Sequence, residues 1–361
     1  MIRRDFIKYS SLSTISILTK KYEAEKLPTN SNKKLGVALL GLGYYSTNLL
    51  APALKLTKHC ELRGIISGTP GKVDKWQKEH GIKDGNVYSY DTMDQIADND
   101  EIDVIYIVTP TATHKDFAVR AANLGKHVWL EKPMAMNAAE CTEIIEACKK
   151  NKVELCIGYR MLHEPNTQTL MSYNSSLPFG AMKSIDSQAG YRGGGGSNWR
   201  YQKAMGGGAL YDMGVYTVNG IRYASGQMPI EVIDARQWQD RSDIMGDIDE
   251  STEYRLLLAN GIEAHGFTSV GKTTNHLKVN CESGWYELRP MQSYNGVVGS
   301  RSDGKLLDVY IENQQAKQMD DDALAILNNK PIIAPGEEGL LDIIIINAII
   351  ESAAKGTSVK I

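Results

Sequence analysis

Cysteine is scarce in this sequence, and its spacing excludes several kinds of site. The five cysteines lie far apart and include no C-x-x-C pair, so neither a thiolate zinc site nor a disulfide framework is predicted. Cys141 and Cys148 are seven residues apart on a predicted helix, nearly two turns from each other and too far for a disulfide. The seven histidines are scattered as well. We therefore predict buried thiols and no metal site.

The sequence also lacks a surplus of one charge and a long apolar run. A formal net charge of -3 provides no broad positive field, which argues against nucleic acid as a partner. No segment approaches the ~18 continuous apolar residues of a spanning helix, so no stable membrane span is expected. What remains is the composition of a globular protein, and 361 residues are too many for one ordinary core. Two folded domains are predicted.

The first 34 residues differ from the rest and are predicted to be an export signal followed by a linker arm. Arg3-Arg4-Asp5-Phe6-Ile7-Lys8 precedes a mildly apolar, serine-rich stretch, an arrangement typical of a twin-arginine signal. This predicts a periplasmic protein. The alternative is a basic, disordered leader on a cytoplasmic protein, because serines interrupt the apolar stretch and no A-x-A cleavage site follows.

A dinucleotide-binding domain is predicted over residues 35–160, where short β-rich runs alternate with helical patterns. This alternation is typical of a Rossmann fold, a doubly wound parallel sheet in the α/β class. The predicted strands are Leu35–Leu40, Cys60–Ser67, Val104–Val108, His127–Glu131 and Glu154–Gly158.

An α+β domain that binds substrate and mediates oligomerisation is predicted over residues 161–361. After a helical pattern at His163–Ser172, consecutive strand patterns predict an open, largely antiparallel sheet. A final helix, Glu337–Ala354, has an isoleucine-rich centre and is expected to pack back on the core. Because an open sheet leaves a face or edge to cover, we expect a homodimer or homotetramer. The strand patterns are Met182–Ala189, Ile230–Gln239, Ser251–Leu258, Glu263–Val270, His276–Asn280 and Gly284–Leu288.

A glycine-rich turn after the first strand is predicted to bind a dinucleotide. Gly41 permits the tight turn, and Gly43 lets backbone N–H groups approach a pyrophosphate. Ser46 stands where a third glycine is usual and is still small enough for close packing. Taken alone, the turn could be an ordinary strand-to-helix connection, but the βα units that follow favour the cofactor site. The whole segment is Gly41-Leu42-Gly43-Tyr44-Tyr45-Ser46.

The end of the second strand favours NADP over NAD. An acidic residue there would bind the ribose hydroxyls of NAD and repel a 2′-phosphate, and none is present. Ser67, Gly68, Thr69 and Lys72 instead offer hydroxyl groups, a turn and a cation, which suit a phosphate. The alternative is that these are common turn residues without a ligand.

Two further clusters are predicted to carry the chemistry. Glu131, Lys132 and Pro133 end a parallel strand, at the sheet edge where ligands bind, so Lys132 is expected beside the nicotinamide. A structural Glu-Lys pair is the alternative, but Thr109, Pro110 and His114 follow the preceding strand at the same edge. Asp212 and Tyr216 are four apart after Gly206-Gly207-Gly208, on one face if the segment is helical. The alternative is a mobile glycine loop, a capping Asp212 and a core Tyr216.

These clusters resemble the Gfo/Idh/MocA oxidoreductases, and within them the glucose-fructose branch. The similarity runs from about Leu35 to the end of the chain, and the tyrosine at 216, where most members have histidine, is the pattern of that branch. It is carried by Ile66-Ser67-Gly68-Thr69-Pro70, Glu131-Lys132-Pro133, Gly158-Tyr159-Arg160, Trp199-Arg200, the block from Gly206 to Tyr216, and Pro335-Gly336-Glu337-Glu338-Gly339. One departure is Pro110-Thr111, where the family usually has Pro-Asn.

The resemblance implies that Lys132 and Tyr216 flank the sugar carbon that exchanges hydride, with Asp212 close by. It also implies that Trp199-Arg200 and Tyr159-Arg160 border the nicotinamide half of the cofactor, with Glu131 among the cofactor contacts and Tyr159 among the substrate contacts. Removing a hydroxyl proton needs a base, and a neighbouring ammonium favours the phenolate form of a tyrosine.

The predicted function is hydride transfer between NADP and a sugar or polyol. An exported enzyme has no pool of free cofactor, so a ping-pong reaction that oxidises one sugar and reduces another on retained NADP is expected. The alternatives are a sugar dehydrogenase or reductase with exchangeable NAD(P), a glycosidase that uses bound NAD transiently, and a non-catalytic sugar-binding protein.

Overall fold

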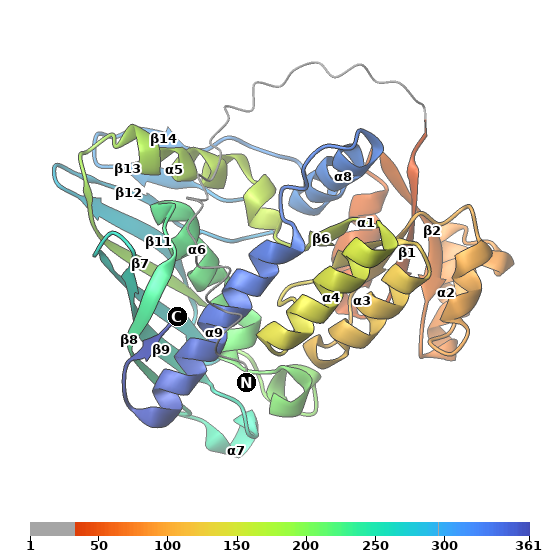
Figure 1. Cartoon of the computed structure of the whole chain (residues 1–361), viewed down its shortest axis with the longest axis horizontal. Coiled ribbons are helices and arrows are strands. Elements are labelled where there is room, and N and C mark those ends of the chain that lie inside the picture. Colours follow the sequence, from red (N-terminus) through yellow and green to blue (C-terminus); the bar gives the residue numbers. More distant parts are fainter. Residues whose placement is uncertain (1–32, 295) are drawn as a thin grey trace. The chain divides into compact units, whose positions relative to one another are not determined.

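The segment from Leu35 to Ile157 forms a six-stranded parallel sheet with the strand order β3-β2-β1-β4-β5-β6. The structure is a computed structural model that describes residues 33–294 and 296–361 (Figure 1). The strands are β1 (Leu35–Leu40), β2 (Cys60–Ile66), β3 (Val87–Tyr88), β4 (Val104–Ile107), β5 (His127–Leu130) and β6 (Leu155–Ile157). This order reverses between β1 and β4, as in a dinucleotide-binding Rossmann sheet. The predicted Rossmann sheet is confirmed.

Helices on both faces bury the sheet. They are α1 (Ala51–Leu54), α2 (Val73–His80), α3 (His114–Asn123) and α4 (Ala138–Asn151). Every residue of β1 is buried, which explains its continuous apolar sequence. Asn137 begins α4 because its side chain accepts a hydrogen bond from the Glu140 amide at 3.0 Å. The twin-arginine motif and most of the arm lie outside the described residues.

The second sheet has nine strands in the order β14-β13-β12-β11-β7-β10-β9-β8-β15. The strands are β7 (Met182–Gly190), β8 (Pro229–Trp238), β9 (Ser251–Leu258), β10 (Glu263–Ser269), β11 (Thr274–Cys281), β12 (Trp285–Leu288), β13 (Gly299–Arg301), β14 (Leu306–Leu307) and β15 (Val359–Lys360). Strands β7 and β10 are parallel, and the other neighbours are antiparallel. The predicted open, largely antiparallel sheet is confirmed. Strands β13 to β15 are too short to give a sequence pattern.

Three helices cover one face of this sheet and connect it to the Rossmann sheet. They are α5 (Pro165–Ser176), α6 (Val215–Ser225) and α9 (Gly336–Lys355). Helix α9 contacts β8 of the second sheet and also β6 and α4 of the first, so it belongs to both layers (Figure 1). Gly336 is required at its start, since a Cβ there would lie 2.5 Å from the Leu155 side chain. In the described chain, no helix combines the length and apolarity that crossing a bilayer requires.

Helix α8 (Gln314–Leu327) was not predicted, because much of its buried face is polar. Gln314, Gln315, Gln318 and Asp322 are all buried, so the helix shows little apolar periodicity. It packs against α1, β2 and the 3-10 turn η7 (Arg160–His163). A helix with a polar buried face cannot be recognised from apolar periodicity in the sequence, because its buried positions are explained only by their partners in the folded structure.

Asp322 makes the stability of the fold depend on pH. Burial raises the pKa of its carboxyl to about 7, while an unfolded aspartate has a pKa of about 3.9. Between these values the folded protein holds a proton that the unfolded chain has lost, so stability falls as the pH rises. We expect the urea midpoint to be lower at about pH 8 than at about pH 5.5, and Asp322→Asn to reduce that difference. The exposed Asp308→Asn is the control, and an unchanged difference in Asp322→Asn would contradict the expectation.

Candidate active site

Lys132, Asp212 and Tyr216 lie side by side at the carboxyl end of β5. The Lys132 Nζ donates to the Asp212 backbone carbonyl at 2.7 Å and lies 3.6 Å from the Asp212 Oδ1. The same ammonium is 4.7 Å from the centroid of the Tyr216 ring. Asp212 and Tyr216 are each 8% exposed, so the ammonium, the carboxylate and the phenol share one largely enclosed space. A charge interaction is stronger here than in water.

The backbone that carries Asp212 is a π-helical turn. Residues Leu210–Gly214 form the turn η10, and α6 begins directly after it at Val215. The segment is helical, as the spacing required, but it is a π turn followed by an α-helix, and both side chains lie beside Lys132. Single π turns inside helices occur often at functional sites, because they change the direction of side chains and carbonyl groups. Here the turn presents both the carbonyl and the carboxylate of Asp212 to Lys132.

The three glycines before this turn are required by close neighbours. Gly206 has a φ of +80°, and a Cβ there would lie 2.6 Å from the Thr111 Cβ. Gly208 has a φ of +115°, and a Cβ there would lie 2.1 Å from the Asp249 Oδ1. The Asp249 Oδ2 in turn accepts a hydrogen bond from the Leu210 amide at 2.9 Å. The glycines thus let the chain pack closely at the start of the π turn.

Two residues hold the second oxygen of Asp212. The Tyr191 hydroxyl donates to Asp212 Oδ2 at 3.0 Å, and the Arg200 Nε lies 3.4 Å from the same atom. Arg200 also stacks on the Trp199 ring at 4.6 Å. Burial, followed by the Asp212 carboxylate, raises the pKa of Tyr191. Tyr191 was not predicted from the sequence, where its one signal is its place between a strand and a glycine run.

Glu131 and Arg160 are also buried beside this site. Glu131 accepts a hydrogen bond from the Tyr106 hydroxyl at 2.7 Å, and burial raises the pKa of its carboxyl. Gly158 leaves room for this carboxylate, since a Cβ there would lie 2.8 Å from its Oε1. Arg160 is buried and contacts the Tyr216 ring at 5.5 Å.

Tyr159, predicted as a substrate contact, points elsewhere. It is buried, and after burial itself the Asp342 carboxylate and Tyr223 are the groups that raise its pKa. These groups belong to α9 and α6. In the described part of the chain, the Tyr159 side chain makes no hydrogen bond or ion pair with Lys132, Asp212 or Tyr216, although Tyr159 directly precedes Arg160.

The glycine-rich turn has the geometry that a pyrophosphate needs. Gly41 has a φ of +94°, and a Cβ there would lie 2.5 Å from the Val108 carbonyl oxygen. The Ser46 hydroxyl donates to the Gly41 carbonyl at 2.5 Å, so the serine closes the turn in place of a third glycine. Gly43 has no neighbour within 4 Å of a Cβ, which leaves open space beside its backbone. Leu42 is buried, while Tyr44 is 76% exposed.

Lys72, in the loop after β2, connects that loop to the glycine-rich turn after β1. The Lys72 Nζ donates to the Leu42 carbonyl at 2.9 Å. Ser67 accepts a hydrogen bond from the Thr69 amide at 3.0 Å, which shapes the loop. Gly68, Thr69 and Lys72 are exposed, so this loop can contact a ligand.

His114 supports the same edge from inside. Its Nδ1 lies 2.9 Å from the Pro133 carbonyl and its Nε2 2.9 Å from the Thr109 carbonyl. Burial lowers the pKa of the ring. The histidine thereby ties the end of β4 to the segment after β5, and Pro110 begins the turn between Thr109 and His114.

Two family models match the chain. One is described as an oxidoreductase family with an NAD-binding Rossmann fold and matches residues 35–159. The other is described as a GFO/IDH/MocA C-terminal domain and matches residues 175–287. The chain belongs to the Gfo/Idh/MocA family of oxidoreductases. The resemblance inferred from the motifs is confirmed.

Proteins similar to this Gfo/Idh/MocA oxidoreductase include enzymes that act on sugars and polyols. An aldose-aldose oxidoreductase from Caulobacter crescentus, in a crystal structure with glycerol, is 34% identical, with a TM-score of 0.87 over 91% of this chain and 100% of its own. The D-xylose 1-dehydrogenase (NADP+) of Haloarcula marismortui is 24% identical over 92% of this chain and 95% of its own. A scyllo-inositol dehydrogenase from Lactobacillus casei, 18% identical with a TM-score of 0.76, covers 91% of this chain and 99% of its own and shares the fold.

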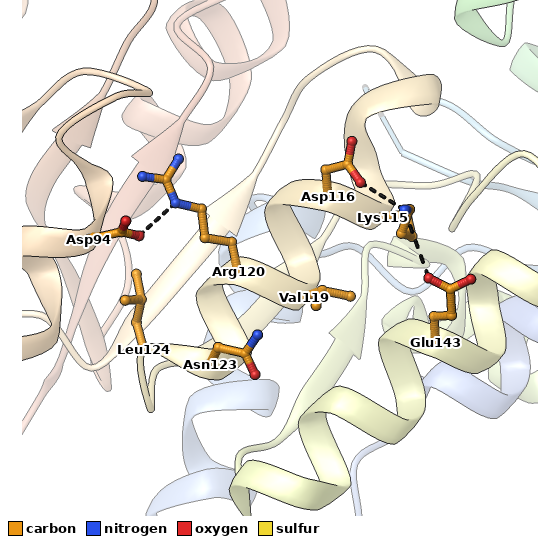
Figure 2. A pocket seen from close by; sticks show the side chains of 8 residues that line it. All are labelled: Asp94, Lys115, Asp116, Val119, Arg120, Asn123, Leu124 and Glu143. Carbon is orange, nitrogen blue, oxygen red and sulfur yellow. Dashed lines mark hydrogen bonds and ion pairs between the residues drawn. The ribbon is translucent and has the colours of Figure 1, made fainter.

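A shallow hollow of this Gfo/Idh/MocA protein lies on α3 and α4 (Figure 2). Ion pairs cross its surface, with Arg120 Nε 2.6 Å from the Asp94 Oδ1 and Lys115 Nζ 2.8 Å from the Asp116 Oδ1. Its charges are therefore paired with each other, and it contains none of the predicted site residues. Its lining is Asp94, Lys115, Asp116, Val119, Arg120, Asn123, Leu124 and Glu143.

Proposed function

We propose that the protein is an NADP-dependent sugar oxidoreductase that transfers hydride between the nicotinamide and a sugar carbon. The observation that carries the proposal is the Lys132 ammonium 4.7 Å from the Tyr216 ring, at the sheet edge where a Rossmann fold binds its ligand. The aldose-aldose oxidoreductase and the xylose dehydrogenase support a sugar substrate.

The residues present can perform the acid–base part of this reaction. A bound nicotinamide supplies the hydride acceptor or donor. Tyr216 takes the proton from the sugar hydroxyl during oxidation and returns it during reduction, with Lys132 stabilising the charge that develops. Asp212 holds Lys132 through its carbonyl at 2.7 Å and through its carboxylate at 3.6 Å.

The cofactor would be held by the glycine-rich turn and the loop after β2. The open side of Gly43 suits a pyrophosphate, and the exposed Lys72 together with Ser67 and Thr69 suits a 2′-phosphate. The absence of an acidic residue from Ser67 to Lys72 favours NADP over NAD.

We further propose a ping-pong reaction in which the cofactor stays bound while one sugar is oxidised and another is reduced. An aldose-aldose oxidoreductase 34% identical to this chain supports paired sugar substrates. Export by the twin-arginine route belongs to the same proposal, since folded protein travels with its cofactor. Cell fractionation of the full chain decides between periplasm and cytoplasm.

The test is to purify the protein without added cofactor and to identify any nucleotide released on denaturation. Aldoses and ketoses are then added singly and in pairs while the absorbance of reduced nicotinamide is followed. Retained NADP that one sugar reduces and a second reoxidises supports the proposal. Loss of the nucleotide during gel filtration, with turnover only on added NAD(P), indicates an ordinary dehydrogenase. Hydrolysis of an aryl glycoside without net redox change indicates a glycosidase.

A homodimer or homotetramer formed through the second sheet is part of the proposal. The face of this sheet turned away from α6 and α9 carries partly exposed polar side chains such as Asp186, His265 and His276. Light scattering measures the mass directly, and a monomer at working concentration would contradict this part.

Lys72 provides a test of cofactor choice. Lys72→Glu replaces the cation near the expected 2′-phosphate by an anion, so NADP should bind about tenfold more weakly or worse, with NAD little affected. Binding of both nucleotides to nucleotide-free protein is measured by calorimetry. Lys75→Glu is the matched control, because Lys75 is exposed on α2 and pairs with Glu79. Equal loss of NAD and NADP affinity would show that Lys72 does not distinguish them.

A further inference from the structure

A fully buried guanidinium lies beside the Tyr216 ring. Arg160 is 1% exposed. It donates through Nη2 to the Gln292 Oε1 at 3.0 Å and through Nη1 to the Ser293 carbonyl at 3.2 Å. It also donates through Nη1 to the Gln314 Oε1. All of these acceptors are uncharged.

The charge of Arg160 has no carboxylate partner at ion-pair distance among the described residues. Other interior arginines do have one, since Arg222 Nη1 lies 2.7 Å from the Asp342 Oδ1 and Arg241 Nε 2.6 Å from the Glu250 Oε1. Burying an unpaired charge is strongly destabilising. The fold therefore retains this charge at a cost in stability, as functional sites often do.

Phenols surround the guanidinium instead. Its central carbon lies 4.6 Å from the Tyr294 ring centroid and 5.5 Å from that of Tyr216. Burial acts to lower the pKa of Arg160, but Tyr216, Tyr294 and Tyr45 act to raise it, and the net shift is upward. The coupling is reciprocal: Arg160 acts to lower the pKa of both Tyr45 and Tyr294, although burial is the larger effect and leaves both raised.

Arg160 adds a second cation to Lys132 beside the same ring. The Lys132 ammonium contacts the same ring at 4.7 Å, but it also lies 3.6 Å from the Asp212 carboxylate, which offsets part of its field. The titratable and charged groups around Tyr216 include the Lys132 and Arg160 cations, the Tyr45 and Tyr294 phenols, and the carboxyl groups of Asp212 and Glu131, the second of which is coupled to both cations.

We propose that Arg160 is a positioning residue that stabilises the Tyr216 phenolate and so enables it to accept the proton of a sugar hydroxyl. This inference rests on the proposed function. As the sugar C–H bond breaks and its electron pair leaves as hydride to the nicotinamide, the O–H proton moves to the Tyr216 oxygen and a C=O bond forms. When the second sugar is reduced, Tyr216 returns that proton to the carbonyl oxygen.

The test follows phenolate absorbance against pH in the purified holoenzyme, without sugar. Subtracting the curve of the matching Tyr216→Phe variant isolates the signal of this phenol from the other tyrosines. In Arg160→Met the Tyr216 signal is expected at a pH higher by roughly one unit or more, and Arg160→Lys should restore most of the wild-type curve. The pH dependence of sugar oxidation should move in the same direction. Superimposable curves in the wild type and a folded Arg160→Met would overturn the proposal.

A second variant covers the case in which Arg160→Met does not fold. In Lys132→Met the lysine charge is gone and Arg160 remains beside the ring, so adding Arg160→Gln to this variant should move the Tyr216 signal to higher pH. Superimposable curves of the single and the double variant would also overturn the proposal. Because the titration requires neither sugar nor turnover, its failure is distinguishable from failure of the proposed function, which the nucleotide and sugar assays report.

Discussion

Replacing Tyr216 with phenylalanine is expected to lower kcat for sugar oxidation by about 10²- to 10⁴-fold, the usual contribution of a general acid–base group. The change removes one hydroxyl and keeps the ring, so the contacts of Lys132 and Arg160 with that ring persist. KM for the sugar and retention of the nucleotide should change little. Single-turnover reduction of the bound cofactor by sugar measures the step directly.

Tyr223→Phe is the matched control for this variant. Tyr223 is also buried on α6, two turns after Tyr216, but it lies beside Arg222 and away from Lys132. Its loss should leave the single-turnover rate unchanged. A Tyr216→Phe enzyme with normal turnover would show that this phenol is not the acid–base group.

Removing the Arg222 charge is expected to destabilise the fold by about 3–5 kcal/mol, because it leaves a buried carboxylate unpaired. Arg222 on α6 donates to the Asp342 Oδ1 at 2.7 Å and to the Glu338 Oε2 at 2.8 Å, both on α9. Asp342 is fully buried, and burial raises the pKa of its carboxyl to about 6 despite the arginine. Urea unfolding of Arg222→Met against the wild type measures the loss.

Two further variants separate the contribution of the buried ion pair to stability from that of side-chain packing. The double variant Arg222→Met with Asp342→Leu removes both buried charges and should recover part of the lost stability. Lys355→Met breaks an exposed pair with Glu351 on the same helix and should cost less than about 0.5 kcal/mol. A double variant no more stable than Arg222→Met alone would show that the ion pair is not the source of the loss.

Much of the fold could be predicted because its strands are apolar and end at turn residues. Leu35–Leu40 and Ser251–Leu258 were predicted to the residue, since each is bounded by clear breaks in the apolar pattern. Helix α8 could not be found in this way, because Gln314, Gln318 and Asp322 occupy its buried face. Periodicity reports apolar burial and is insensitive to polar burial.

The candidate site likewise contains residues that sequence motifs indicate and others that only the tertiary structure brings there. Lys132, Asp212 and Tyr216 stand in motifs at strand and helix ends, so the sequence could nominate them. Tyr191 approaches Asp212 only through the pairing of distant strands, and the unpaired charge of Arg160 is a property of its three-dimensional surroundings. The π turn at Leu210–Gly214 was equally hidden, because a regular helix accounts for the same spacing.

The hydrogen bond from Lys132 to the carbonyl of residue 212 has a consequence for mutational scanning. A main-chain acceptor is present whatever amino acid occupies the position, so Asp212→Asn or Asp212→Ala would leave the 2.7 Å anchor of the lysine available. The effect of side-chain substitutions at position 212 will therefore be smaller than the full contribution of this backbone segment to holding the Lys132 ammonium. Measuring the backbone contribution requires a change in the path of the chain, such as the deletion of one residue from the turn.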